Sequence, residues 1–429
     1  MKSKFTLWFN KRVNFADSRF YSLLESYGLN LHNVEIKILD EHATIDAFCT
    51  NLYIMPVTSA YYGQGKGIGI DKGIGIDNYD LTHDETFIDM ATNKGIRCII
   101  DYSWEASSVK DITSYKFWKR NERIIQDYDI QFLSNTSSDI NHKLNSGKDF
   151  FLNFPMFSYE VRSTNATANI DYHLNTSMCL KEHKKYFFNL FIGDIDKFKN
   201  ILTLASYYRR GLKESSVYSA VLGHNDNMID MYEDRLRTHE AMLARHPIPD
   251  VNKTLEYLIE NENDIIHKHL PFERYEGNPD FDVNSKGSGP VERKIPQVAH
   301  ESHMWCVVET LSTIDIIHHT EKTFKPISVG HPFMVLGSIN QNKDLKKYGY
   351  ELYDDIINYD FEEPDPNMLN MFKNNAIEKY FNEVERLIKE GPGIFYQKSV
   401  LEKVEWNKHN FQKQTTRDAL QLELAELFV

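Results

Sequence analysis

Cysteine is scarce in this chain, and its four residues are scattered at Cys49, Cys98, Cys179 and Cys306. No Cys-x-x-Cys pair occurs, and thiols spread this widely fit a reducing compartment better than a disulfide framework. Cys49, Cys98 and Cys306 lie in apolar sequence, which predicts that they are buried. We therefore expect a cytoplasmic protein.

Long hydrophobic runs are also absent. No stretch approaches the roughly 20 residues that a membrane-spanning helix needs. The apolar stretch Phe5–Phe9 is too short for a signal peptide and instead predicts a first β-strand. We therefore expect no membrane partner.

An excess of positive charge is missing as well. The chain has 49 Lys and Arg against 62 Asp and Glu, a formal net charge of −13. Proteins that wrap duplex DNA carry a basic face, so this balance argues mildly against such a partner without excluding a local basic cleft. Residues 181–185 and the pair Arg209-Arg210 are candidates for a basic patch, although solvated surface charge explains each more simply.

The remaining composition is that of an ordinary globular protein, with 41% apolar and 26% charged residues. A chain of 429 residues exceeds what one hydrophobic core usually holds, so two domains are expected.

The first half alternates between strand-like and helix-like segments. Short apolar runs predict strands at 5–9, 34–39, 51–56, 97–101, 130–133 and 150–154. Helices are predicted at 20–27 and 87–94, each followed by a glycine, which commonly ends a helix. This alternation predicts a mostly parallel, doubly wound sheet.

A second sheet is expected after a polar linker at about 160–180, with a strand at 186–192 and a helix at 197–208. Further helices are expected at 371–390 and 400–427. The predicted parts are 1–175, 176–375 with an insertion at about 225–296, and C-terminal helices over 376–429.

The most informative stretch is 303–337. Apolar runs at 305–308 and 333–336 predict two buried strands. Between them Thr320 is a good N-cap, and Glu321 lies in the first turn, where its charge suits the helix dipole. A carboxylate and the lysine after it thus meet at a helix start behind a strand, where open α/β sheets bind phosphorylated ligands.

This stretch resembles the donor-site signature of the alpha-1,3-fucosyltransferases and of related bacteriophage proteins of that glycosyltransferase type. The shared letters are Thr320-Glu321-Lys322-Thr323-Phe324-Lys325-Pro326 and the pair Pro332-Phe333. The match covers about a tenth of the chain. It implies the GT-B class, which is α/β with two Rossmann-like doubly wound domains that face a cleft. It also implies C-terminal helices that pack back across the domains.

The resemblance implies roles for individual residues. Glu321 would bind the ribose hydroxyls and Lys322 the diphosphate of a nucleotide sugar, with Lys325 as a second cation one turn further on. The remaining predicted donor-binding residues are Glu309, Thr310, His318 and Thr320. Thr310 stands where the fucosyltransferases have Asn, and His318 stands near their Tyr. The simpler alternative is a plain helix cap with an exposed ion pair, worth ~0.3–1 kcal/mol.

Sugar transfer needs a general base on the acceptor hydroxyl. Asp101 and Glu105 follow the predicted buried strand at 97–101, whose carboxyl end lies on the ligand side of such a sheet. Glu105 is the first choice for the catalytic base and Asp101 the second. The alternative is that Asp101 caps the next helix and Glu105 lies on the surface.

Two patterns resemble metal sites. Asp194-Ile195-Asp196 has the spacing that holds Mn²⁺ or Mg²⁺ in the other large glycosyltransferase fold. Five histidines gather around the motif, at His300, His303, His318, His319 and His331, as zinc ligands do. A chance Asp-x-Asp is common in an acidic chain, and the resembling family is metal-free, so we predict no metal. The glycine-rich repeat at 66–77 lacks the spacing of a phosphate loop and predicts an exposed loop.

The sequence therefore predicts a metal-independent glycosyltransferase, a hexosyl- or pentosyltransferase that needs no cofactor beyond its nucleoside diphosphate sugar donor. Its acceptor would be a glycan or a hydroxymethylated base of phage DNA, in the host cytoplasm if a phage encodes the chain. The alternative is a catalytically silent nucleotide-sugar or glycan-binding protein of the same fold. Oligomeric state is left open.

Overall fold

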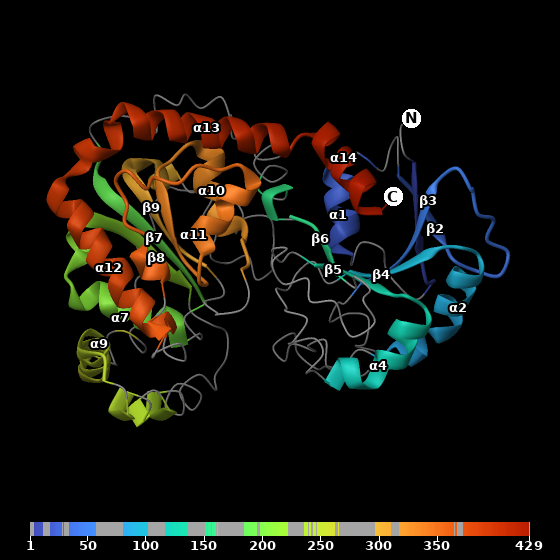
Figure 1. The fold of residues 1–429 in the computed structure, drawn as a ribbon, viewed down its shortest axis with the longest axis horizontal. Helices are drawn as coiled ribbons and strands as arrows, with labels where there is room; N and C mark the ends of the chain where they lie inside the picture. The colour runs from blue at the N-terminus through green and yellow to red at the C-terminus, as the bar shows by residue number, and fades with distance from the viewer. Residues whose placement is uncertain are drawn as a thin grey trace. The chain divides into compact units, whose positions relative to one another are not determined.

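A computed structural model of the chain divides into two compact units, Met1–Ser163 with Lys413–Val429 (unit 1) and Thr164–Gln412 (unit 2) (Figure 1). The structure describes residues 4–11, 18–27, 29, 34–56, 80–101, 116–134, 151–155, 157–159, 161, 184–194, 198–221, 236–238, 240–241, 243–245, 247–261, 265, 297–309, 317–363, 365–366 and 372–428.

Unit 1 is built on a six-stranded parallel sheet with the order β2-β1-β3-β4-β5-β6. Its strands are β1 (Phe5–Phe9), β2 (Val34–Ile38), β3 (Thr50–Pro56), β4 (Arg97–Asp101), β5 (Gln131–Ser134) and β6 (Phe151–Asn153). Its helices are α1 (Arg19–Ser26), α2 (Glu85–Asn93), α4 (Lys116–Asp127) and α14 (Arg417–Phe428).

Side chains alternate between the two faces of this sheet along each strand, and each face is covered by a hydrophobic core. In β1, Phe5, Leu7 and Phe9 belong to a core formed with α1 and α14. Trp8 points the other way, into a second core formed with α2 and α4. A sheet buried on both faces is what the near-continuous apolar runs of the sequence require.

The last helix of the chain completes unit 1. Leu420, Leu424 and Phe428 of α14 lie in its core, and the Phe428 ring centroid is 6.4 Å from that of Phe5. One helix was expected at 400–427, but the structure has two, α13 (Lys398–Gln414) and α14. Thr416 separates them, because its hydroxyl accepts a hydrogen bond from the backbone of Ala419 and caps the second helix.

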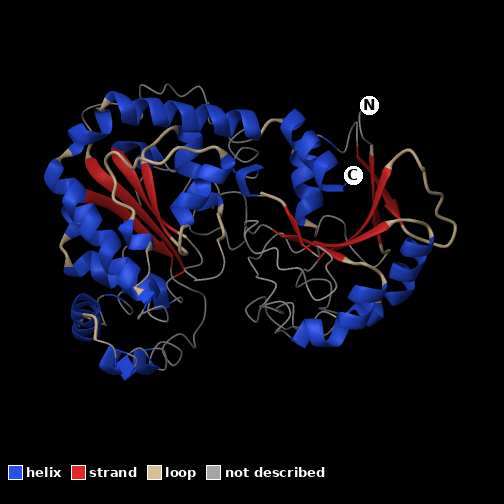
Figure 2. Cartoon of the chain, viewed as in Figure 1, coloured by secondary structure: helices blue, strands red, loops and turns tan. Residues whose placement is uncertain are grey.

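Unit 2 has a four-stranded parallel sheet with the order β10-β9-β7-β8, seen edge-on among its helices in Figure 2. Its strands are β7 (Tyr186–Asp194), β8 (Ser216–Val221), β9 (Ser302–Val308) and β10 (Phe333–Leu336). Its helices are α7 (Phe198–Arg209), α9 (Pro249–Glu260), α10 (Glu321–Val329), α11 (Gln341–Asp344), α12 (Phe372–Glu390) and α13.

The chain leaves β7 towards β8 and leaves β9 towards β10, in opposite directions along this sheet. Right-handed crossovers then place α7 and α10 on opposite faces. The predicted class, α/β with two Rossmann-like doubly wound units, is confirmed. Helix α4 and strand β8 were not predicted from the sequence.

Two predictions about single residue types can be compared with the structure. Cys98 and Cys306 are buried as expected, and burial raises the pKa of each thiol to about 12, so neither is a reactive thiolate. Cys49 is half-buried. Cys179 lies outside the described residues, as does the glycine-rich repeat at 66–77.

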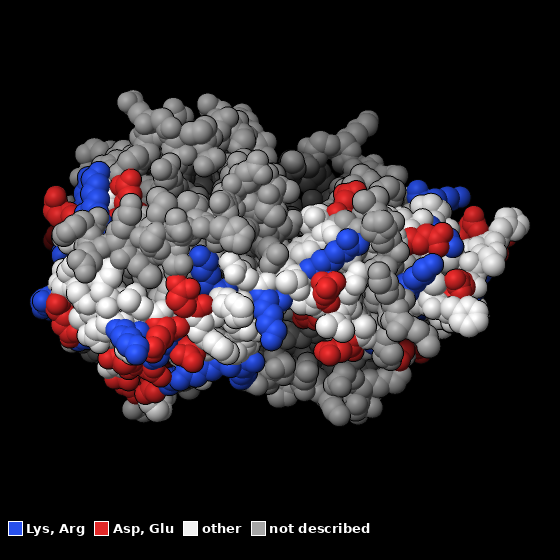
Figure 3. Space-filling model, turned by 90° about the horizontal axis from the view of Figure 1, so that it is seen from above, with Lys and Arg blue, Asp and Glu red and all other residues white. Residues whose placement is uncertain are grey.

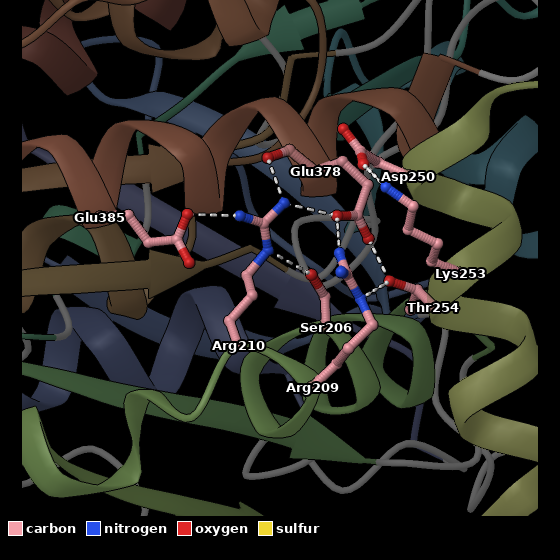
Figure 4. Close-up of polar contacts among 8 residues, drawn as sticks. All are labelled: Ser206, Arg209, Arg210, Asp250, Lys253, Thr254, Glu378 and Glu385. Carbon is pink, nitrogen blue, oxygen red and sulfur yellow. Dashed lines mark hydrogen bonds and ion pairs between the residues drawn. The ribbon is translucent and has the colours of Figure 1, made fainter.

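Arg209 and Arg210, candidates for a surface patch, instead hold helices together (Figure 4). Both guanidinium groups bind Glu378 of α12, at 2.8 and 2.7 Å, and Arg210 also binds Glu385 at 2.7 Å. Glu378 accepts a further hydrogen bond from Thr254 of α9. One buried carboxylate thereby links α7, α9 and α12. The interpretation as a basic surface patch is wrong, because both guanidinium groups form ion pairs within unit 2.

We expect Glu378→Ala to lower the free energy of unfolding by about 3–5 kcal/mol, because it leaves two guanidinium groups without their buried partner. Urea unfolding measures the change. Lys253→Ala is the matched control, since it breaks an ion pair with Asp250 whose side chains are 60% and 46% exposed, and should cost less than about 1 kcal/mol. An equal loss in both variants would contradict the structural role of Glu378.

Candidate functional site

The order of the unit 2 sheet reverses between β7 and β9. In open α/β sheets, ligands bind outside the carboxyl ends of the strands at this point. Helix α7 begins four residues after β7 ends, at Phe198, and α10 begins at Glu321. Both helix N-termini therefore lie at the carboxyl edge of the sheet, and the predicted donor-binding residues that the structure describes belong to this edge.

Glu309 follows β9 directly and is buried. Its carboxylate accepts hydrogen bonds from the backbone N–H of Thr320 at 2.9 Å, from the Thr320 hydroxyl at 2.6 Å and from the Thr323 hydroxyl. Glu309 was predicted to bind the donor. Its oxygens are instead committed to the start of α10, so we assign it the role of fixing that helix to the end of β9.

Lys199 joins the two sides of the reversal point. It lies in the first turn of α7, is buried, and donates a hydrogen bond to the backbone carbonyl of Glu309. Lys199 was not among the donor-binding residues predicted from the sequence. The sequence feature that could have indicated this role is that Lys199 is the second residue of a helix that follows a parallel strand.

The backbone N–H groups at the start of α10 are hydrogen-bonded within the protein. Thr320 is the N-cap, as predicted, and its hydroxyl accepts from Lys322 N at 3.3 Å. The next N–H, of Thr323, bonds the Thr320 carbonyl. With the Glu309 carboxylate beside them, these groups already hold a negative charge at the helix N-terminus. Attraction for a further anion must therefore come from side chains.

Glu321 and Lys322 supply exposed charge at this position. Their ion pair is 2.8 Å long, and the side chains are 19% and 26% exposed. Burial opposes ionisation of Glu321, but the ammonium groups of Lys322 and Lys325 outweigh it and lower its pKa to about 2. Glu321 is thus a carboxylate at any physiological pH, able to accept hydrogen bonds from a ligand's hydroxyl groups, while Lys325 is largely buried in the same helix.

A buried network lies behind the segment that leads into α10. The Gln341 side-chain amide donates to the His318 carbonyl and to His319 Nδ1, both at 3.0 Å. His319 Nε2 therefore carries the proton and donates to Asp344 at 3.1 Å. A Cβ at Gly337 would lie 2.8 Å from Gln341 Cγ, so only glycine allows this close approach. The network was not predicted from the sequence. It fixes the backbone of His318 and the ring of His319, and so the segment that leads to Thr320.

Other predicted site residues belong to unit 1 or are not described. Asp101, at the end of β4 in unit 1, is buried and accepts from the Ser18 hydroxyl at 2.9 Å and from Phe20 N at 3.2 Å. It therefore anchors the start of α1, which precedes it in the chain, whereas the alternative considered for it was a cap on the next helix. Glu105 and Thr310 lie outside the described residues.

Among the residues that the structure describes, no group of three His, Cys, Asp or Glu side chains is arranged to hold a metal ion. Asp194 ends β7, and residues 195–196 of the Asp-x-Asp pattern are outside the described part. His318 and His319 are buried beside α10, separate from the other three motif histidines, which lie at the opposite end of β9.

Those three histidines form a second cluster. His331 Nε2 and His300 Nδ1 are 3.3 Å apart, and His303 Nδ1 lies 2.8 Å from the Tyr396 hydroxyl. Burial, with the nearby Lys184, lowers the pKa of His300 and of His303 to about 4, and Lys408 adds to the effect on His300. Burial also lowers the pKa of His331, with Lys184 and the other two histidines contributing. All three rings are neutral at pH 7.

This cluster should make unit 2 sensitive to acid. Between pH of about 4 and 6.5 these imidazoles bind protons in the unfolded chain but stay neutral in the folded protein. Their contribution to the free energy of unfolding is therefore complete above pH 6.5 and is lost as the pH falls through that window. We expect the free energy of unfolding to fall by up to about 1.4 kcal/mol per pH unit for each such histidine.

Urea unfolding across that window measures the slope, which His300→Gln should reduce. His409→Gln, at an exposed position of α13, is the control and should leave the slope unchanged. An unaltered slope in the His300 variant would contradict the assignment.

A hollow of about 600 Å³ in unit 2 lies apart from the α10 start. Lys343, Lys346 and Arg386 line it together with residues of 352–360, and it includes none of the predicted donor-binding residues. Its cations are paired with the carboxylates of Glu363, Asp354 and Glu383, as Lys322 is with Glu321, so ion pairing does not separate the two places. We give more weight to the reversal point of the sheet because open α/β sheets bind their ligands there.

Surface charge is mixed where it can be seen. On the face shown in Figure 3, the described Lys and Arg side chains are interspersed with Asp and Glu. The strip of one sign that a DNA acceptor would favour is not present on the described part of this face. No helix in the described part of the chain is both long and apolar enough to cross a membrane.

No protein-family model matches the chain, and no curated protein matches it either. Two solved structures are similar in fold. One, from Listeria monocytogenes, is described provisionally as a UDP-N-acetylglucosamine 2-epimerase, with 11% identity, a TM-score of 0.40 and coverage of 99% of this chain and 98% of that one. The other is UDP-GlcNAc 2-epimerase from Neisseria meningitidis bound to UDP-GlcNAc, with 10% identity, a TM-score of 0.38 and coverage of 99% and 100%. Likeness at this level concerns the fold and carries no argument about the site.

These comparisons correct the function predicted from the sequence. The similar structures bear the names of nucleotide-sugar epimerases, whereas a glycosyltransferase was predicted. Neither sugar transfer nor the silent binding protein is therefore retained. The fucosyltransferase and bacteriophage relation and the modified-DNA acceptor likewise find no support. What remains is the α/β fold with a parallel sheet in each of two units.

Proposed function

We propose that this protein is an enzyme that acts on a nucleoside diphosphate sugar, and that the nucleotide binds at the carboxyl edge of the unit 2 sheet. The observation that carries the proposal is the partly buried Glu321–Lys322 pair at the start of α10, held at the reversal point by Glu309 and Lys199. The names of the two similar structures agree with the substrate class but do not carry the proposal.

The chemistry of the pair suits a nucleotide. An ionised carboxylate accepts hydrogen bonds from two neighbouring hydroxyl groups, which is what a ribose offers. An ammonium group stabilises the charge of a diphosphate, both bound and as a leaving group. Because the helix donors are already engaged, Lys322 supplies the attraction that a free helix N-terminus would otherwise give.

Two sets of hydrogen bonds fix the backbone that carries Glu321 and Lys322. Glu309 ties the N-cap Thr320 to the end of β9, and the Gln341 network holds the two histidines before it. Side chains held this way lose little freedom on binding, which favours a defined ligand geometry. A plain surface cap would need neither the buried carboxylate nor the buried amide.

Lys322→Ala should weaken binding of UDP or GDP by about 10- to 100-fold, because one charge-assisted hydrogen bond is worth about 1.5–3 kcal/mol. It should hardly change binding of the matching nucleoside, which has no phosphate. Titration calorimetry with the diphosphate and the nucleoside measures both. Lys343→Ala, which removes a cation from the 600 Å³ hollow, is the control. A loss of affinity in the control instead would move the site to that hollow.

Glu321→Gln should weaken both ligands alike, by about tenfold, because the ribose is common to them. Wild-type affinity for the nucleoside should also stay level between pH of about 5 and 8, since the carboxylate is ionised throughout and the nucleoside has no phosphate that titrates. Glu363→Gln, at a carboxylate that is 61% exposed, is the matched control. A variant that loses affinity for the diphosphate alone would remove Glu321 from the ribose.

Enzyme activity is tested on the substrate class itself. UDP- and GDP-sugars are incubated with the protein without an added acceptor and followed by proton and phosphorus NMR. Consumption of one of them, slowed by Lys322→Ala, supports an enzyme of this class. Binding without any change in the nucleotide sugars would contradict the enzymatic part while leaving the binding site in place.

A further inference from the structure

One aromatic side chain of unit 1 is left in solvent. Phe48, in the connection between β2 and β3, is 98% exposed, whereas the rings of Phe5, Phe9 and Phe20 are buried. An isolated exposed apolar residue is common, but a large ring held almost completely in water is a typical element of a contact surface.

The turn that carries Phe48 is fixed by hydrogen bonds. The Asp46 carboxylate accepts from Phe48 N at 2.9 Å, and the Asp46 carbonyl accepts from Cys49 N at 3.2 Å. The Asn51 amide donates to the carbonyls of Asp46 and Cys49, at 2.9 and 2.8 Å. The Asn51 oxygen in turn accepts from the indole of the buried Trp8. The ring is therefore presented outward by a structured turn.

A hollow of about 400 Å³ lies directly beside this turn. Its apolar lining is Ile45, Ala47, Cys49, Leu52, Gly95 and Phe428. Ligand pockets in proteins start at about 300 Å³, so the hollow has room for a phenyl ring. The two chain neighbours of Phe48 line it, yet Phe48 itself does not, because the turn directs its ring away.

Charges around the two features are complementary. Lys94 and Arg97 line the hollow. The turn carries the acid Asp46, and Glu41, whose side chain is 83% exposed, precedes the turn. The Lys94 ammonium donates to the backbone carbonyls of Glu41 and Ala43, at 3.2 and 2.7 Å, and keeps its charge. Backbone hydrogen bonds to Phe48 lower the pKa of Asp46, with a smaller contribution from Cys49, which keeps the acid ionised. A surface that carries a protruding ring with acids, next to a hollow with bases, is complementary to itself.

We propose that this face of unit 1 is a symmetric contact between two copies of the chain, in which Phe48 of each copy enters the hollow of the other. A twofold interface uses the same patch on both copies, so one ring and one hollow side by side are all that it requires. Each Lys94 and Arg97 then meets the acidic turn of the second copy. The contact is made by residues of unit 1 and does not depend on the nucleotide site.

Sedimentation velocity of the full chain over a concentration series tests the proposal. We expect the wild type to form a dimer at concentrations up to about 100 µM, and Phe48→Ala to raise the dissociation constant by at least about a hundredfold, because two rings are lost. Leu422→Ala is the matched control, since Leu422 is 66% exposed on α14 of the same unit. A wild type that stays monomeric, or a Phe48 variant that associates like the control, overturns the proposal.

A mixing experiment separates this contact from general stickiness. Phe48→Ala lacks the ring but keeps the hollow, whereas Ala47→Trp keeps the ring and fills the hollow. Each variant alone should stay monomeric, and an equal mixture should form a heterodimer through one intact ring and one open hollow. Because one of two contacts remains, its dissociation constant should be about tenfold above that of the wild type, and the mixture is measured at concentrations raised accordingly. Absence of a heterodimer in the mixture, when the wild type dimerises, would show that the association uses another surface.

Discussion

The carboxylate of Glu309 is the interaction on which unit 2's candidate site depends. It is buried at the end of β9 and collects three hydrogen bonds from the first turn of α10 and its cap. Its own carbonyl receives the ammonium group of Lys199 from α7. A buried carboxylate is tolerated only when its oxygens are satisfied, so sheet end, helix start and neighbouring helix are fixed together. The exposed charges of Glu321 and Lys322 take their positions from that arrangement.

The same arrangement limits what the site can bind and how. A helix N-terminus usually attracts anions through free N–H groups, but here an internal carboxylate has taken that place. In the proposed site, recognition is therefore assigned to two side chains, one cationic and one anionic, which suits a ligand that combines phosphate and hydroxyl groups. Buried pairs elsewhere in unit 2, such as Glu378 with its two arginines, stabilise the frame and contribute nothing to this edge.

Much of the fold could be predicted because its strands are buried on both faces. Apolar runs such as Arg97–Asp101 and Phe333–Leu336 have no amphipathic alternative, and both form strands as expected. Thr320 was recognisable as a cap because capping is a local interaction. Strand β8, with its mixed polar sequence, and the break between α13 and α14 were missed. Their identity depends on neighbouring strands and on the core of unit 1, which local patterns do not contain.

The sequence by itself determined the two-sheet α/β class, the cap of α10 and the placement of a carboxylate–lysine pair behind a strand. Only the tertiary structure decided that Glu309 serves the helix, that Asp101 anchors α1, and that Gln341 and Lys199 reach the same edge from distant parts of the chain. The reason is that a hydrogen bond between residues many positions apart depends on sheet order and helix packing. Periodicity and local motifs report each segment's own preference, whereas the partner of a buried polar group is set by where the whole chain brings the segments together.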